Sequence, residues 1–211
     1  MPTIDQARRL YDNSNQVHDF DHVLRVYRLA EQIAGQEGAD LEIVRAAALL
    51  HDVDDSSSGG EEARLEHHEA SAAYAGRILK EEGWPDERIQ AVQSCIRTHR
   101  FRAGLAPETL EAKVLYDADK LDAIGAIGAA RSLAFAVLDG QPLYAEPSET
   151  FRETLKIEAG EAYTAYHEFL FKLSKIKGKM HTEAGKALAE ERHRFLAGFF
   201  EQLRAEVRGE R

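Results

Sequence analysis

Apolar residues recur three and four positions apart along most of the chain, which is the spacing of one face of an α-helix. Asp40 stands where it can cap the apolar run that ends at Leu50, and Gly83 and Pro85 are expected to end a later helix. The expected helices span 20–34, 41–50, 62–82, 86–98, 107–137, 150–176 and 182–207, with a break in the fifth near Gly125 and Gly128.

Strand signals are almost absent from the sequence, since no alternation of apolar and polar residues is sustained and no Asn-Gly turn separates β-branched runs. The pattern therefore predicts an all-α fold. A length of 211 residues is that of one domain. We expect a single helical domain over 1–211, with a core over 12–138 and a C-terminal helical extension over 148–208 that packs over or beside the functional site.

The net charge of −10 argues against binding to nucleic-acid polymers, which requires a basic surface. No apolar run approaches the length of a membrane span, and the N-terminus lacks the charged-then-apolar order of a signal peptide. The single cysteine, Cys95, cannot form an internal disulfide and is expected in the core. We expect a cytoplasmic protein with a small-molecule partner and no membrane partner; an amphipathic C-terminal helix would permit a homodimer.

Six of the nine histidines lie in the first 99 residues, and four of them fall on the apolar stripe of a predicted helix: His22, His51, His67 and His99. One inward histidine is ordinarily a hydrogen-bonded core residue, because burying an unpaired polar group costs several kcal/mol. Four of them, together with Asp52 and Asp119, favour a divalent-metal site built from imidazole and carboxylate groups of several helices.

The order of these residues resembles that of the HD-domain metal-dependent phosphohydrolase superfamily. The resemblance is carried by HDFDHVLRV around His22, AAALLHDVDD around His51 and Asp52, and YDADKLDAIGAIG around Asp119. The C-terminal KLSKIKGKMHTEAGKALAEERHRFLAGFFEQL is similar to a bacterial branch of that superfamily, the YpgQ/YedJ-like proteins. The resemblance extends from about residue 12 to residue 203.

The resemblance implies an all-α HD domain with His22, His51, Asp52 and Asp119 as metal ligands. It implies hydrolysis of a phosphate ester or anhydride, and the branch implies cleavage of nucleoside triphosphates to monophosphate and pyrophosphate. Two alternatives remain open, a nucleoside monophosphate phosphatase and a catalytically idle HD module that binds a nucleotide as a sensor.

Mixed imidazole and carboxylate ligands favour a transition metal over Mg²⁺. Mn²⁺ is preferred here, with Mg²⁺, Co²⁺, Ni²⁺, Fe²⁺ and Zn²⁺ left open. Some HD enzymes hold a second ion with two further histidines, for which His67 and His99 stand in suitable places, but the branch resembles one-metal enzymes. His68 competes with His67, because adjacent residues of a helix cannot both face inward equally, and His67 is preferred.

The remaining roles follow from the resemblance and from charge. Asp55, four residues after His51, is the candidate to orient the attacking water, and the alternative is a solvated loop residue. His67 is the candidate to protonate the leaving group if it is not a ligand. A polyphosphate in an acidic protein requires local cations, although each lysine taken singly is more often part of a solvated surface. The candidate phosphate contacts are Lys120, Arg25, His99, Lys175 and Lys179.

Overall fold

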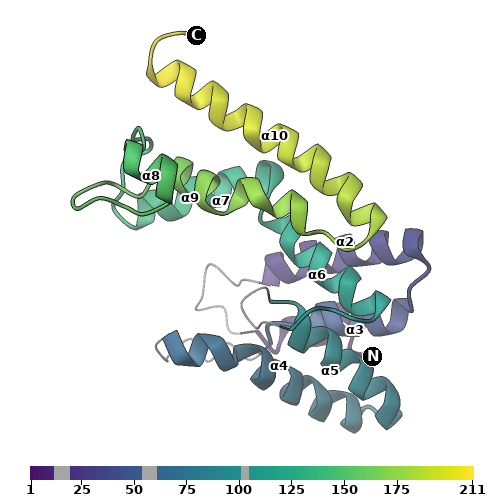
Figure 1. Ribbon diagram of the computed structural model, residues 1–211. Helices are drawn as coiled ribbons and strands as arrows, with labels where there is room; N and C mark the ends of the chain where they lie inside the picture. Colours follow the sequence, from purple (N-terminus) through teal and green to yellow (C-terminus); the bar gives the residue numbers. More distant parts are fainter. Residues whose placement is uncertain (12–19, 54–60, 101–104) are drawn as a thin grey trace. The chain divides into compact units, whose positions relative to one another are not determined.

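The computed structural model describes residues 1–11, 20–53, 61–100 and 105–211, and for residues 61–67 it describes only the backbone. Every regular element in these ranges is a helix, so the predicted all-α fold is confirmed. The elements are α1 (Ile4–Arg8), α2 (Phe20–Glu37), α3 (Leu41–Leu50), α4 (Glu61–Glu81), α5 (Asp86–Thr98), α6 (Leu110–Asp122), α7 (Gly125–Leu138), α8 (Glu149–Thr154), α9 (Ala165–Phe171), the 3₁₀ helix η2 (Leu173–Lys179) and α10 (Glu183–Val207) (Figure 1).

The chain divides into two compact units. The first unit comprises Met1–Asp119 and His181–Gly185, and the second comprises Lys120–Met180 and Lys186–Arg211. The border between them passes through α6 and α10. The interpretation of the whole chain as one HD domain stays a prediction, and each unit is described by itself.

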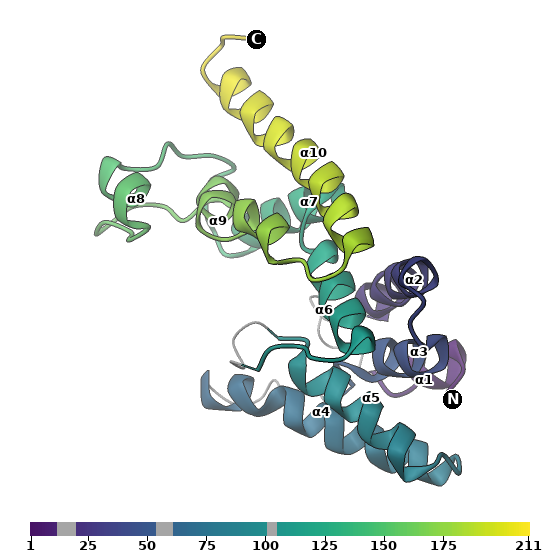
Figure 2. The same ribbon diagram turned by 45° about the vertical axis from the view of Figure 1, so that its right-hand side comes forward.

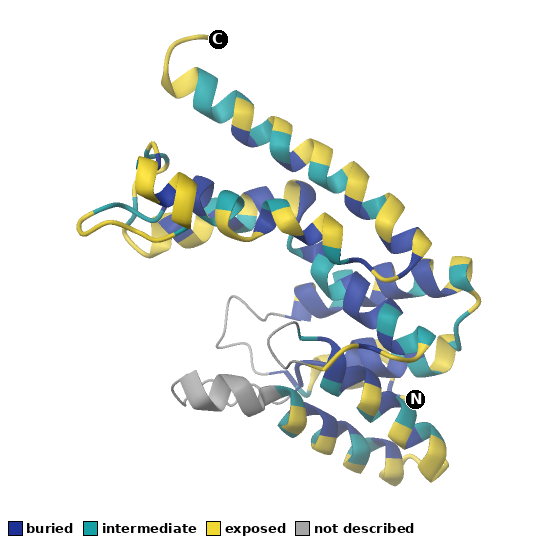
Figure 3. Cartoon of the chain, viewed as in Figure 1, coloured by how far each residue is buried: buried dark blue, intermediate teal, exposed yellow. Residues whose placement is uncertain are grey.

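In the first unit, α3 contacts α1, α2, α4 and α5. Its residues from Ala46 to Leu50 are completely buried, and the helix is dark blue along most of its length in Figure 3. The Asp40 carboxylate accepts hydrogen bonds from the backbone N–H groups of Glu42 and Ile43, so the predicted N-cap is confirmed. Helices α4 and α5 lie side by side in both views (Figure 1 and Figure 2).

A buried carboxylate ties the segment before α10 to α6. Asp117 has no exposed surface and accepts hydrogen bonds from the backbone N–H groups of His181 and Thr182 and from the Thr182 hydroxyl. The rings of Tyr116 and His181 pack edge to face, with their centroids 4.8 Å apart. Charged hydrogen bonds of this kind offset the cost of burying a carboxylate. Asp117 is therefore structural, and it fixes the helix that carries Asp119.

The single helix expected over 107–137 is two helices. The first begins at Leu110, three residues later than expected, and the predicted break is present. Gly125 takes a positive φ of 77°, a backbone conformation that glycine adopts without the steric cost of a Cβ atom. Within the described residues, no one helix is both long and apolar enough to cross a bilayer, and α6 and α7 pass that test only together, as a bent pair.

The single helix expected over 150–176 is wrong. The chain instead forms α8, an irregular stretch, α9 and η2. Leu155 ends α8 in the left-handed conformation, with φ 60°. The Glu161 carboxylate then accepts hydrogen bonds from the backbone N–H groups of Ser148 and Glu158, which holds the irregular stretch in place. The Glu158 N–H is a group that a continuous helix would have bonded internally, and here the carboxylate satisfies it instead.

Candidate metal centre

His51 is the C-cap residue of α3 and has no exposed surface. Its Nδ1 lies 2.8 Å from the carbonyl oxygen of Ala48, so Nδ1 carries the proton and donates it to that oxygen. The lone pair of the neutral ring is then on Nε2, the atom that a metal ion would bind. Burial lowers the pKa of His51 to about 4, with His99 and His22 acting in the same direction and Asp52 opposing them. His51 is therefore held as a neutral ligand.

Two other helices and the residue that follows His51 bring further ligand atoms close to this nitrogen. His22 of α2 places its Nε2 3.4 Å from the Nε2 of His51, and the Oδ1 of Asp119 from α6 lies 3.5 Å from the Nε2 of His22. One ligand atom from each of these three side chains lies within 4.8 Å of the others. The Oδ2 of Asp52, directly after α3, lies 3.5 Å from His51 Nε2 and 4.0 Å from His22 Nε2. The four ligands named from the sequence are thus together.

These spacings suit a common ion. Two ligand atoms that each lie about 2.1 Å from one ion are about 3 Å apart when they subtend a right angle at the ion, and about 4 Å apart when they lie on opposite sides of it. Two imidazoles and two carboxylates form a mixed nitrogen and oxygen set, which transition-metal ions accept. The Asp119 side chain is 15% exposed, the most of the four. The cluster could therefore hold a divalent ion.

His99 and Arg100 contact the second oxygen of the Asp52 carboxylate. The His99 ring meets the His51 ring edge to face, 5.2 Å between centroids, and its Nε2 lies 3.5 Å from Asp52 Oδ1. The Arg100 guanidinium donates to that oxygen over 3.2 Å. His99 thus lies beside the candidate ligands, and its role as a phosphate contact stays a prediction. Arg100 was not a candidate, and the only sequence signal was its position directly after His99.

Two candidate residues fall outside the description. Asp55 lies outside the described residues, and for His67 the side chain does. His68 is described, and its side chain is only 11% exposed. Burial lowers the pKa of His68, and its interactions with His99 and Arg100 act in the same direction while Glu69 opposes them. His68 is therefore close enough to His99 and Arg100 for them to affect its pKa. The preference for His67 over His68 stays a prediction.

The candidate cations lie in both units. Arg25 is half-buried on α2, one turn beyond His22, in the first unit. In the second unit, burial lowers the pKa of Lys179, and the charges of Lys175, Lys120 and Lys172 lower it further. The charges of Lys120 and Lys175, which the sequence singled out, therefore act on Lys179 within that unit, and Lys172 adds to them. The sequence feature that could have pointed to Lys172 is the lysine-rich segment that begins with it.

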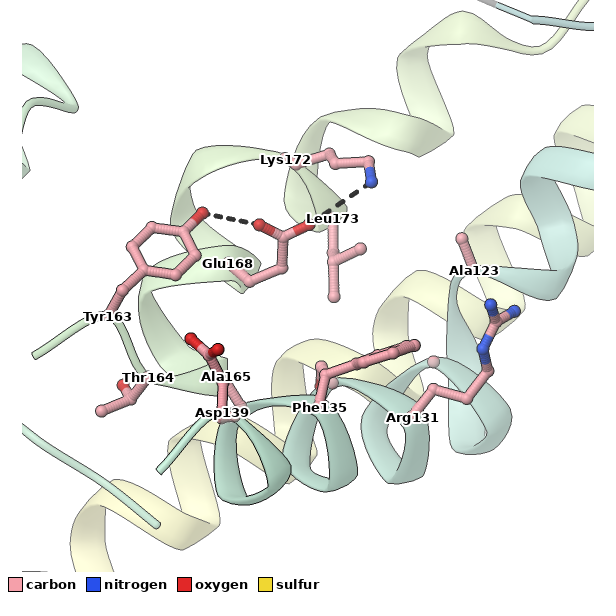
Figure 4. A pocket seen from close by; sticks show the side chains of 13 residues that line it. Ala123, Arg131, Phe135, Asp139, Tyr163, Thr164, Ala165, Glu168, Lys172 and Leu173 are labelled. Atoms are coloured by element: carbon pink, nitrogen blue, oxygen red, sulfur yellow. Dashed lines mark hydrogen bonds and ion pairs between the residues drawn. The ribbon is translucent and has the colours of Figure 1, made fainter. Parts of the chain in front are cut away.

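A cavity of about 380 Å³ in the second unit has no counterpart among the predicted residues. It lies between α7 and α9, and the side chains of Phe135 and Leu173 form part of its apolar lining (Figure 4). Glu168 accepts a hydrogen bond from the Tyr163 hydroxyl and pairs with Lys172. These charged and polar groups are bonded to one another, so the cavity presents mainly an apolar wall.

Comparisons with known proteins identify the family and the fold that the chain shares. Residues 19–124 match the model of the HD domain family. The chain is similar to the uncharacterized protein YpgQ of Bacillus subtilis (strain 168), 36% identical over 194 residues that cover 91% of this chain and 85% of that protein. The crystal structure of B. subtilis YpgQ in complex with ADP has a TM-score of 0.73 at 34% identity, covering 97% of this chain and 98% of that one. An HD-superfamily hydrolase from Bacillus thuringiensis has a TM-score of 0.73 at 30% identity, covering 97% and 94%.

Proposed function

Because the chain belongs to the HD domain family, we propose that it is a metal-dependent phosphohydrolase that cleaves nucleoside triphosphates to monophosphate and pyrophosphate. The observation that carries the proposal is the tautomer of His51. Its Nδ1 proton is committed to Ala48, so its Nε2 lone pair faces His22 and Asp52. A purely structural histidine would have no need of a carboxylate and a second imidazole at that nitrogen.

The chain's own residues divide the work of the reaction. His22, His51, Asp52 and Asp119 would hold the ion, whose Lewis acidity would activate water and offset charge on the phosphate oxygens. Asp55 orients the attacking water, and its position four residues after His51 supports this role through the family resemblance.

A histidine of α4 protonates the leaving group, pyrophosphate. His67 is the candidate from the sequence, and His68 is the alternative, with a side chain that is only 11% exposed. A variant of each residue separates the two, because only the proton donor should alter the basic side of the pH profile.

Binding of the phosphate chain requires positive charge in an acidic protein. Lys120 follows the ligand Asp119 in the chain, and Arg25 stands one helical turn after His22. The charges of Lys175 and Lys120 act on Lys179. Together with His99, these residues are the proposed phosphate contacts. The ADP in the relative's crystal structure supports a nucleotide as the substrate class.

Product analysis tests the substrate assignment. Protein supplied with Mn²⁺ is incubated with nucleoside triphosphates and, separately, with monophosphates, and the products are separated by anion exchange. Monophosphate and pyrophosphate in equal amounts support the proposal. Orthophosphate from a monophosphate would replace it with a phosphomonoesterase, and binding of nucleotide without any product would replace it with a sensor.

Replacement of a proposed phosphate contact tests the binding residues in the same assay. Lys120→Ala should raise KM for the triphosphate at least 10-fold, because a charged hydrogen bond to phosphate contributes about 1.5–3 kcal/mol. Lys113→Ala is the matched control, since it removes a lysine from the same helix two turns away. An unchanged KM in Lys120→Ala would remove Lys120 from the site.

A further inference from the structure

The Asp52 carboxylate uses its two oxygens on two different sides. Oδ2 faces the nitrogens of His51 and His22, at 3.5 and 4.0 Å. Oδ1 faces His99 Nε2 at 3.5 Å and Arg100 Nη2 at 3.2 Å. Only 7% of the Asp52 side chain is exposed, so both sides are enclosed by protein. The second side is a distinct environment that the four metal ligands do not explain.

His99 presents a lone pair to that second side. Its Nδ1 donates to the backbone carbonyl of Ile96, which leaves Nε2 of the neutral ring without a proton. The Nε–H of Arg100 points to this nitrogen over 3.4 Å. His99 is 1% exposed, so its tautomer is fixed by the protein in the same way as that of His51. A carboxylate oxygen and an imidazole lone pair thus converge on one guanidinium.

The two atoms that accept these hydrogen bonds, an imidazole nitrogen and a carboxylate oxygen, are also atoms that bind metal ions. Imidazole nitrogen and a carboxylate that already faces one ion are the groups with which a second divalent ion binds beside the first. The guanidinium carries a permanent positive charge and five N–H donors in one plane, so it satisfies both acceptors at once. The structure holds a cationic side chain where an ion with the same partners would sit.

We propose that Arg100 takes the place of a second metal ion beside Asp52 and thereby limits the site to one ion. This inference rests on the proposed function, because it takes His22, His51, Asp52 and Asp119 as the ligands of the first ion. The Arg100 side chain is 25% exposed, against 7% for Asp52, so solvent reaches this side chain. A fixed charge there supplies the electrostatic stabilisation of phosphate that a second ion would give.

Counting bound Mn²⁺ tests the inference without any measurement of activity. Metal-stripped protein is dialysed against increasing Mn²⁺, and the bound ions per chain are determined by elemental analysis. Wild type should bind about one ion, and Arg100→Ala and Arg100→Ser should each bind about two. EPR supplies the second readout, because two Mn²⁺ ions that share a carboxylate couple magnetically and weaken the signal of isolated Mn²⁺.

Two further variants separate charge from position. Arg97→Ala removes an arginine one turn earlier, on α5, that pairs with Glu69 at 2.8 Å, and it should still bind one ion. Arg100→Ala combined with His99→Ala removes the nitrogen ligand and should return the count to one. Two ions in wild type, or one ion in both single Arg100 variants, would overturn the inference and leave the proposed function intact. No ion in wild type would overturn the proposed function as well.

Discussion

Replacement of Gly185 by alanine tests the buried contact between Asp117 and the start of α10. An added Cβ would lie 2.3 Å from Asp117 Oδ2 and 2.7 Å from Thr182 Oγ1. These two oxygens are themselves joined by a hydrogen bond of 2.7 Å. Asp117 is completely buried, so the carboxylate has no room to withdraw into solvent. The methyl group therefore has to displace at least one of the bonds that satisfy the buried charge.

The free energy of this change follows from three contributions. Overpacking a buried site costs about 1–3 kcal/mol, and loss of a hydrogen bond to a charged group costs about 1.5–3 kcal/mol. Alanine gains about 1 kcal/mol over glycine in a helix interior. Gly185→Ala should therefore lower the free energy of unfolding by about 1.5–5 kcal/mol, a large share of the stability of a typical domain.

Urea denaturation followed by circular dichroism measures the change, with metal-free protein used for every variant. Gly198→Ala is the matched control: it lies in the same helix, and no atom lies within 4 Å of its added Cβ. The control should gain about 0.5–1 kcal/mol from helix propensity alone. If Gly185→Ala were as stable as wild type, the contact between Asp117 and Thr182 would be refuted.

Three further predictions concern the metal, the pH and the thiol. Mn²⁺ at 100-fold excess over Kd should stabilise wild type by about 2.7 kcal/mol and so raise its melting temperature. The melting temperature of His51→Gln, measured in the same way by differential scanning fluorimetry, should not change on addition of Mn²⁺. Hydrogen bonds from Ser148 and Glu158 lower the pKa of Glu161 to about 2 from 4.5, so the stability that its charge contributes is present above pH 4.5 and lost as the pH falls towards 2; Glu161→Gln should lose that acid dependence in urea titrations, and an unaltered acid limb would contradict the assignment. Burial raises the pKa of the Cys95 thiol to about 12, so a thiol reagent should label it only after denaturation, and rapid labelling of native protein would contradict its place in the core.

The helices with an unbroken apolar stripe could be predicted from the sequence, because periodicity and caps are local signals. The helix over 86–98 and the cap at Asp40 are examples. The region 150–176 could not be predicted in this way. Its interruption depends on a leucine in the left-handed conformation and on a carboxylate at 161 that binds a backbone N–H thirteen residues earlier. Neither feature leaves a trace in the local pattern.

The candidate metal ligands could be named from the sequence because their order and flanking residues resemble a known superfamily. The tautomers of His51 and His99 could not, since they depend on which backbone carbonyl each Nδ1 reaches. The role of Arg100 also depends on geometry, because a guanidinium next to a histidine in sequence becomes informative only when both reach Asp52. The roles of Asp55 and His67 stay predictions.

Metal-dependent turnover is the most direct test of the central claim. Triphosphate hydrolysis is measured on metal-stripped protein, on the same protein after addition of Mn²⁺, and on Asp119→Asn, which removes a ligand charge. Asp21→Asn, an exposed carboxylate next to His22 on α2, is the control. We predict hydrolysis only with Mn²⁺, full activity in Asp21→Asn, and a loss of at least 100-fold in Asp119→Asn with an unchanged circular dichroism spectrum. Hydrolysis that persists without metal, or in Asp119→Asn at the wild-type rate, would contradict the account.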